Sequence, residues 1–138
     1  DTTVISFDIN EHRCVDVGKG YLDQTYPGRH TLIKGNSLDT IKAYALHHPG
    51  ETFDLIFIDG GHAYNIALND IQNCKALSTP STILIVDDIV NQPNLHAEWT
   101  RGPTRAWGEL VADGQIKENG HLDVGRGRGF SYGNYIHQ

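Results

Sequence analysis

The sequence predicts an α/β protein: a mostly parallel sheet in three α/β/α layers, with an antiparallel hairpin at the C-terminal end. Short apolar segments alternate with segments whose apolar residues recur every three to four positions, as strands and amphipathic helices do. Two of the short segments, residues 53–58 and 83–86, are almost continuously apolar, which is typical of parallel strands. We expect one domain spanning residues 1–138.

The first expected strand covers residues 4–7, which are mostly β-branched or apolar, and it ends at Asp8. A helix follows it. Asn10 is the expected N-cap of that helix, and Val17 and Tyr21 are among its apolar residues at helical spacing.

A second strand is expected at residues 31–33. The glycine-rich turn after it leads into a helix in which Leu38, Ile41 and Ala45 recur at helical spacing. Ser37 is the expected N-cap of this helix, because a hydroxyl can accept a hydrogen bond from a free amide of the first turn.

The middle of the chain continues the alternation. Residues 53–58 predict a central strand covered on both faces, which stops at Asp59. An amphipathic helix follows, and its apolar stripe consists of Tyr64, Ala67, Leu68, Ile71, Cys74 and Leu77. Residues 83–86 predict another buried strand, which ends at Asp87 and Asp88.

The C-terminal third predicts one more helix and a hairpin. Pro103 is suited to the first turn of the helix, Trp107 to its buried face, and Gly114 to its C-terminal cap. Two strands, at residues 115–124 and 130–136, would be joined through the run GRGRG. A turn explains this run better than an RNA-binding segment, because the run is short and unrepeated.

Composition limits the classes of partner. The net charge of −6 comes with scattered basic residues, which argues against a nucleic acid partner or an anionic membrane surface. Cys14 and Cys74 form no CxxC pattern and fit free thiols of a reducing compartment, so we expect a cytoplasmic protein. The sequence leaves open whether the protein is a homo-oligomer.

Carboxylates follow three of the expected strands, at Asp8, Asp59 and the pair at positions 87–88, where ligands of parallel sheets bind. The motif IDGGHAY at positions 58–64, with the later acidic pair, resembles class I S-adenosylmethionine-dependent methyltransferases. Within that class the chain is similar to the metal-dependent O-methyltransferases of methyltransferase family 24, of the macrocin and catechol types. The resemblance runs from about residue 4 to residue 136 and implies a Rossmann-like fold.

The resemblance implies two functional sites. Asp8 would accept hydrogen bonds from the ribose hydroxyls of S-adenosylmethionine, and Ile9 would also bind the cofactor. Asn36 and Ser37 would lie against its adenine ring. The other site would hold Mg²⁺ through Asp59, Asp87 and Asp88, with His62 as the base that deprotonates a small-molecule methyl acceptor carrying adjacent hydroxyls. Without the resemblance, an acidic pair after a strand is more often a helix cap.

The sequence departs from that family in one respect. The first strand and glycine-rich loop of the family fold have no counterpart before residue 4, and this strand lies centrally in the family's sheet. We therefore expect a seam between the strands ending at Asp8 and at Asp59, and restored cofactor binding when upstream sequence is added. Two alternatives stay open: a non-catalytic Rossmann-like scaffold and an NAD-binding oxidoreductase.

Overall fold

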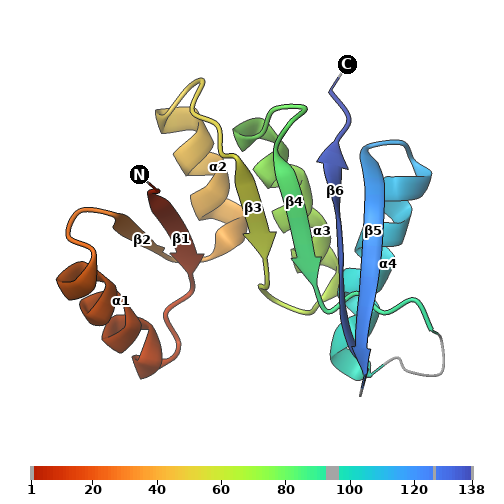
Figure 1. Ribbon diagram of the computed structural model, residues 1–138, viewed down its shortest axis with the longest axis horizontal. Helices are drawn as coiled ribbons and strands as arrows, with labels where there is room; N and C mark the ends of the chain where they lie inside the picture. The colour runs from red at the N-terminus through yellow and green to blue at the C-terminus, as the bar shows by residue number, and fades with distance from the viewer. Residues whose placement is uncertain (1, 93–96, 126, 138) are drawn as a thin grey trace. The chain divides into compact units, whose positions relative to one another are not determined.

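A computed structural model describes residues 2–92, 97–125 and 127–137 (Figure 1). The chain divides into two compact units, residues 1–47 and 48–138. The first unit contains β1 (Val4–Asp8), α1 (Arg13–Thr25), β2 (His30–Lys34) and α2 (Ser37–His47). The second contains β3 (Leu55–Ile58), α3 (Tyr64–Cys74), the 3-10 turn η1 (Lys75–Leu77), β4 (Ile83–Asp87), α4 (Glu98–Ala112), β5 (Ile116–Gly125) and β6 (Arg128–Tyr135).

The first unit is a pair of parallel strands with two helices. β1 and β2 pair in parallel register, with Asp8 opposite Lys34. Two predicted helix caps are wrong. Asn10 lies outside α1, in the left-handed region at φ 63°, and His12 is the N-cap. Ser37 is already helical, and Asn36 caps α2 because its side-chain oxygen accepts a 3.0 Å hydrogen bond from the Leu38 amide.

The second unit contains a four-stranded sheet in the order β3-β4-β6-β5. β3 and β4 are parallel, whereas β6 is antiparallel to both β4 and β5. The predicted hairpin is confirmed, with Gly125 paired to Arg128 across its end. Arg126, in the middle of the predicted turn, lies outside the described residues.

The core of the second unit lies between this sheet and the helices α3 and α4. Its fully buried side chains include Ile71 on α3 and Leu84 on β4. The opposite side of β3 exposes Leu55 and Phe57, which are 53% and 56% accessible. The prediction that β3 is covered on both faces is therefore wrong for the described chain. The apolar run shows that both faces of the strand are hydrophobic, but the described elements of this unit cover one of them.

Helix α4 begins five residues earlier than the sequence predicted. It starts at Glu98, so Pro103 lies inside the helix and not in its first turn. Trp107 is buried as expected, and Gly114 follows the helix in the left-handed region at φ 68°. The early start has a tertiary cause, because Gly102, just before Pro103, packs against the backbone at positions 62–64.

The fold class is confirmed: the protein is an α/β protein whose sheet is parallel in part and ends in an antiparallel hairpin. The described strands form two separate sheets, β1-β2 and β3-β4-β6-β5, and the division falls where the sequence predicted a seam. A single domain over residues 1–138 stays a prediction. None of the described helices combines the length and the apolar character needed to cross a membrane.

Candidate functional site

The adjacent ends of β3 and β4 bring the predicted site residues of the second unit together (Figure 1). Ile58 pairs with Val86, so the residues that follow them leave the sheet side by side. Asp59, His62 and Asp88 each offer a ligand atom, and these atoms all lie within 4.8 Å of one another. The sequence-based prediction that parallel strand ends would gather these acids is confirmed for β3 and β4.

His62 and Asp88 interact directly. His62 Nε2 lies 2.9 Å from Asp88 Oδ2, and the two side chains are 48% and 15% exposed. The imidazole therefore has a carboxylate that orients it and a face that a substrate can reach. Asp88 occupies the left-handed backbone region at φ 58°, a conformation that Asp and Asn tolerate better than most other residues.

The acids of this site repel one another. Burial, followed by the nearby charge of Asp87, raises the pKa of Asp59 above its ordinary value. The pKa of Asp88 is raised by the same two causes, in the same order, and the charge of His62 opposes the shift in both residues. Asp87, the last residue of β4, thus lies close enough to act on both carboxylates. A bound cation would relieve this repulsion, so the residues present fit a hard divalent metal ion.

The loop after β3 comes close to side chains of α3 at its two glycines. A side chain at Gly60 would start 2.9 Å from Asp70 Oδ2, and a side chain at Gly61 would start 2.9 Å from the side chain of Ile66. These contacts let the loop pass close over α3, with Asp59 and His62 beside the acids of β4.

Asp70 and Pro103 also line the hollow at the site, and the sequence analysis gave neither of them a role there. Asp70 is 4% exposed and lies on the buried side of α3 beside Ala67 and Ile71. An acid within an apolar helical stripe is a signal that could have identified it. Pro103 carries no comparable signal, because its place in the site follows from the packing of α4.

The predicted cofactor residues lie in the first unit. Asp8 Oδ1 accepts a 2.5 Å hydrogen bond from the Asn10 amide, and Asp8 O accepts one of 2.9 Å from Gly35. The turn at positions 35–36 therefore lies beside the end of β1. Ile9 is 56% exposed. The roles of Asp8, Ile9, Asn36 and Ser37 toward a cofactor stay predictions.

A second histidine and carboxylate pair lies outside this site. His121 Nε2 is 2.7 Å from Asp123 Oδ1, and His121 Nδ1 is 2.9 Å from Ser131 Oγ. Ser131 is fully buried, so this arrangement of serine, histidine and aspartate does not present a nucleophile to solvent. Its place across the β5-β6 ladder indicates a structural hydrogen-bond network.

Solved structures share this fold. An O-methyltransferase from Bacillus cereus, in complex with SAH, aligns with a TM-score of 0.74 and 19% identity, over 96% of this chain and 62% of its own. TomG from Streptomyces achromogenes, an O-methyltransferase of tomaymycin synthesis in complex with SAM, aligns at 0.72 and 16% identity, over 98% and 62% of the two chains. CalS11, a TDP-rhamnose 3'-O-methyltransferase of calicheamicin biosynthesis, aligns at 0.70 and 18% identity, over 96% and 58%.

The chain thus spans roughly three fifths of the length of each of these structures. No curated protein matches the sequence. A family described as a methyltransferase domain matches residues 1–89, which include β1 to β4 and the acids after β3 and β4. The chain belongs to this methyltransferase domain family.

Proposed function

We propose that the protein transfers the methyl group of S-adenosylmethionine to a hydroxyl oxygen of a small molecule, with magnesium-assisted deprotonation of that hydroxyl. The observation that carries the proposal is the cluster of Asp59, His62 and Asp88 beside the ends of two parallel strands. The family match and the fold shared with O-methyltransferases support the methyl transfer.

Asp59 and Asp88, together with Asp87, would hold the metal ion. Ligand atoms of Asp59 and Asp88 lie within 4.8 Å of each other, which is close enough for one ion to bind both carboxylates. Bound there, Mg²⁺ would lower the pKa of a substrate hydroxyl and fix its orientation. Adjacent hydroxyls suit such a site because both oxygens can replace water on one ion.

His62 is the proposed proton acceptor. Its partner Asp88 orients the ring, and about half of the side chain is accessible. An imidazole in such a place can accept a proton from a hydroxyl. A ring nitrogen of His62 could instead bind the metal ion, since it is one of the three ligand atoms that lie within 4.8 Å of one another. The variant His62→Gln separates the two roles: a base contributes to turnover alone, whereas a ligand contributes to metal affinity as well.

The first unit would supply cofactor contacts. An ionised Asp8 can accept hydrogen bonds from both ribose hydroxyls, and Asn36 and Ser37 follow the adjacent strand β2. The side-chain oxygen of Asn36 already caps α2, so its amide nitrogen is the group that we assign to the adenine ring. Ile9, which is exposed, would provide apolar contact beside the ribose.

The proposal is tested with the chain and with a form extended at its N-terminus, in which we expect cofactor binding. The assay measures methyl transfer from labelled S-adenosylmethionine to catechol, used as a vicinal dihydroxy probe, with Mg²⁺ or with EDTA. We expect transfer that requires Mg²⁺ and falls about a hundredfold in Asp88→Asn, because the ion loses a charged ligand. Asp23→Asn, which changes an exposed surface ion pair on α1, is the matched control and should keep full activity.

Calorimetry with S-adenosylhomocysteine completes the test. Full activity of Asp88→Asn, or in EDTA, would contradict the metal role while leaving methyl transfer intact. If neither the chain nor a form extended at its N-terminus binds S-adenosylhomocysteine, the methyl transfer proposal is wrong and the scaffold interpretation is favoured.

A further inference from the structure

Helix α4 packs directly on the loop that carries His62. An added side-chain carbon at Gly102 would lie 2.1 Å from His62 O and 2.7 Å from the Tyr64 amide nitrogen, which no real contact allows. The helix backbone therefore touches the backbone of the loop at this point. This contact is the tertiary reason for the early start of α4, since residues 98–102 form the turn that makes it.

Two residues later, at Thr104, the same helix contacts the turn that follows β4. Thr104 Oγ1 accepts a 3.1 Å hydrogen bond from the Val90 amide and donates a longer one, at 3.4 Å, to Asp88 O. One hydroxyl thus engages the backbone on both sides of the turn that follows β4. Asp88 needs such support, because its φ of 58° is an uncommon backbone conformation for a residue other than glycine.

A third contact ties the start of α3 to α4. Tyr64 donates a hydrogen bond to Glu109, and Arg105 Nε donates to the other oxygen of that carboxylate at 2.9 Å. The guanidinium carbon of Arg105 lies 4.2 Å from the centre of the Tyr64 ring. The side chains of Arg105 and Glu109 are 65% and 41% exposed, so we expect a small energetic contribution from these contacts, which join the first residue of α3 to α4.

Helix α4 therefore contacts both loops of the candidate site, at Gly102 and at Thr104. We propose that Thr104 is a positioning residue for the metal site: through the turn at positions 88–90, its hydroxyl keeps Asp88 at ligand distance from Asp59 and His62. This inference rests on the proposed function. It has a physical basis, because metal ligands must hold their distances to within about 0.2 Å, and small displacements of a supporting shell weaken a site.

The test compares Thr104→Val with Thr104→Ser in the whole chain, with Mn²⁺ as the probe metal and free Mn²⁺ measured by its paramagnetic resonance spectrum. Valine keeps the branched shape and removes the hydroxyl, whereas serine keeps the hydroxyl. We expect Thr104→Val to weaken Mn²⁺ binding about tenfold or more, and Thr104→Ser to stay within about threefold of the original protein.

Thr100→Val is the matched control. Thr100 lies on the same helix, is fully buried, and donates a 2.9 Å hydrogen bond to Ala97 O within the first turn of the helix. Its loss should lower the melting temperature, as the loss of Thr104 should, because each removes a hydrogen bond from the same helix. A merely structural role for Thr104 predicts equal effects of the two valine variants on Mn²⁺ affinity.

The outcomes are distinct. Unchanged Mn²⁺ affinity in a folded Thr104→Val protein, or equal losses in the valine and serine variants, would overturn the positioning role and leave the proposed function standing. Failure of the original protein to bind Mn²⁺ would overturn the metal site and the positioning role together. A loss in Thr104→Val alone supports the inference.

Discussion

The two units of the chain differ in what stabilises them. In the second unit, the sheet and two helices bury side chains such as Ile71 and Leu84 completely. In the first, α1 has no buried residue, and its apolar side chains Val17 and Tyr21 are 73% and 65% exposed. Ile41 and Tyr44 on α2 are the buried apolar side chains of that unit among the described residues.

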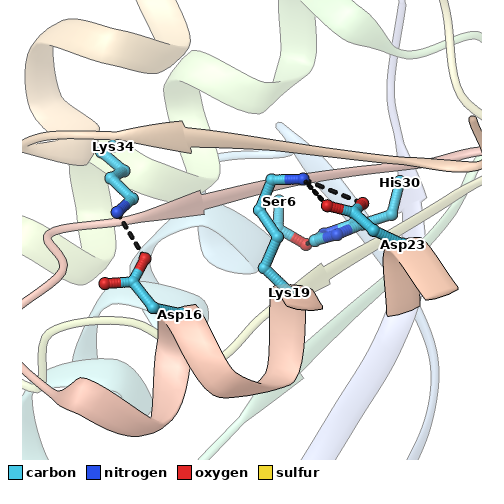
Figure 2. Close-up of polar contacts among 6 residues, drawn as sticks. All are labelled: Ser6, Asp16, Lys19, Asp23, His30 and Lys34. Atoms are coloured by element: carbon cyan, nitrogen blue, oxygen red, sulfur yellow. Dashed lines mark hydrogen bonds and ion pairs between the residues drawn. The ribbon is translucent and has the colours of Figure 1, made fainter. Parts of the chain in front are cut away.

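Polar contacts join the strands and helix α1 of the first unit. Lys34 on β2 forms an ion pair with Asp16 on α1 at 2.5 Å, and His30 Nε2 lies 2.9 Å from Ser6 Oγ across the β1-β2 pair (Figure 2). Exposed ion pairs contribute little free energy, so this unit has few strong contacts within itself. The candidate metal site therefore lies on a well-packed scaffold, whereas the predicted cofactor residues lie on a weakly packed one.

The largest expected difference between the two units is in the rate at which their free cysteines are modified. Cys14 on α1 is exposed, whereas Cys74 on α3 is 8% exposed, and burial raises its pKa to about 12. At pH 8 nearly all Cys74 side chains would therefore be the unreactive thiol, and burial also limits the access of a reagent to the sulfur. We expect an aromatic disulfide reagent to modify Cys14 at least a thousandfold faster than Cys74.

The control for this prediction is Cys14→Ser, which should leave only slow labelling. Addition of urea should release Cys74 in a single cooperative step as the second unit unfolds. Equal modification rates of Cys14 and Cys74 in the native protein would show that the second unit opens as readily as the first. The second unit would then not be the better packed of the two.

Truncation of apolar side chains gives the next largest effect. Leu84→Ala removes a fully buried side chain from β4, so we expect a loss of about 2–5 kcal/mol in the free energy of unfolding. Val17→Ala, on the exposed face of α1, should change it by no more than about 0.5 kcal/mol. Urea denaturation of the full chain measures both. A large loss in Val17→Ala would show that this face of α1 is covered in solution.

The sequence correctly predicted that the residues after β3 and β4 would lie together, because the signals for these strand ends are local. A buried strand ends at Asp59 and the next at Asp87, and parallel neighbours necessarily end at one edge. The position of Thr104 could not be predicted, because its contact with the 88–90 turn depends on the packing of α4. The predicted start of α4 was wrong for the same reason. Pro103 favours a first turn locally, but the packing of Gly102 against His62 favours an earlier start of the helix.

The caps of the first unit could not be predicted for a different reason. Asn10 and Ser37 are both good N-caps by residue type, but each has a polar neighbour that competes for the same role. Asn36 takes the capping position of α2, and the backbone amide of Asn10 donates a hydrogen bond to Asp8 Oδ1. Local hydrogen-bonding alternatives of similar free energy cannot be ranked from the sequence alone.

A third prediction concerns the acids of the second unit in metal-free protein. Burial and the charge of Asp87 raise the pKa of Asp88, so the folded state favours its neutral form. The corresponding stabilisation is present at acid pH and is lost as the pH rises through the folded-state pKa. In EDTA at neutral pH, Asp88→Asn should therefore melt at a higher temperature than the original protein, and Asn tolerates the left-handed backbone at this position.

The difference should shrink as the pH is lowered through the raised pKa of Asp88, because the original carboxyl then becomes neutral. Added Mn²⁺ should reverse the order, because only the original protein has the full set of ligands. A lower melting temperature for Asp88→Asn in EDTA at neutral pH would show that the bond to His62 outweighs the repulsion by Asp87.

The smallest expected effect is that of the ion pair between α1 and β2. Lys34 and Asp16 are 46% and 60% exposed, so a double-mutant cycle with Lys34→Ala and Asp16→Ala should give a coupling free energy of about 0–1 kcal/mol. About 1 M NaCl should remove most of it, because exposed charges are screened at that ionic strength. A coupling above about 2 kcal/mol that resists salt would mean that the pair is desolvated in solution. The α1 side of the first unit would then be covered in solution. The unit would be better packed in solution than the described residues alone indicate.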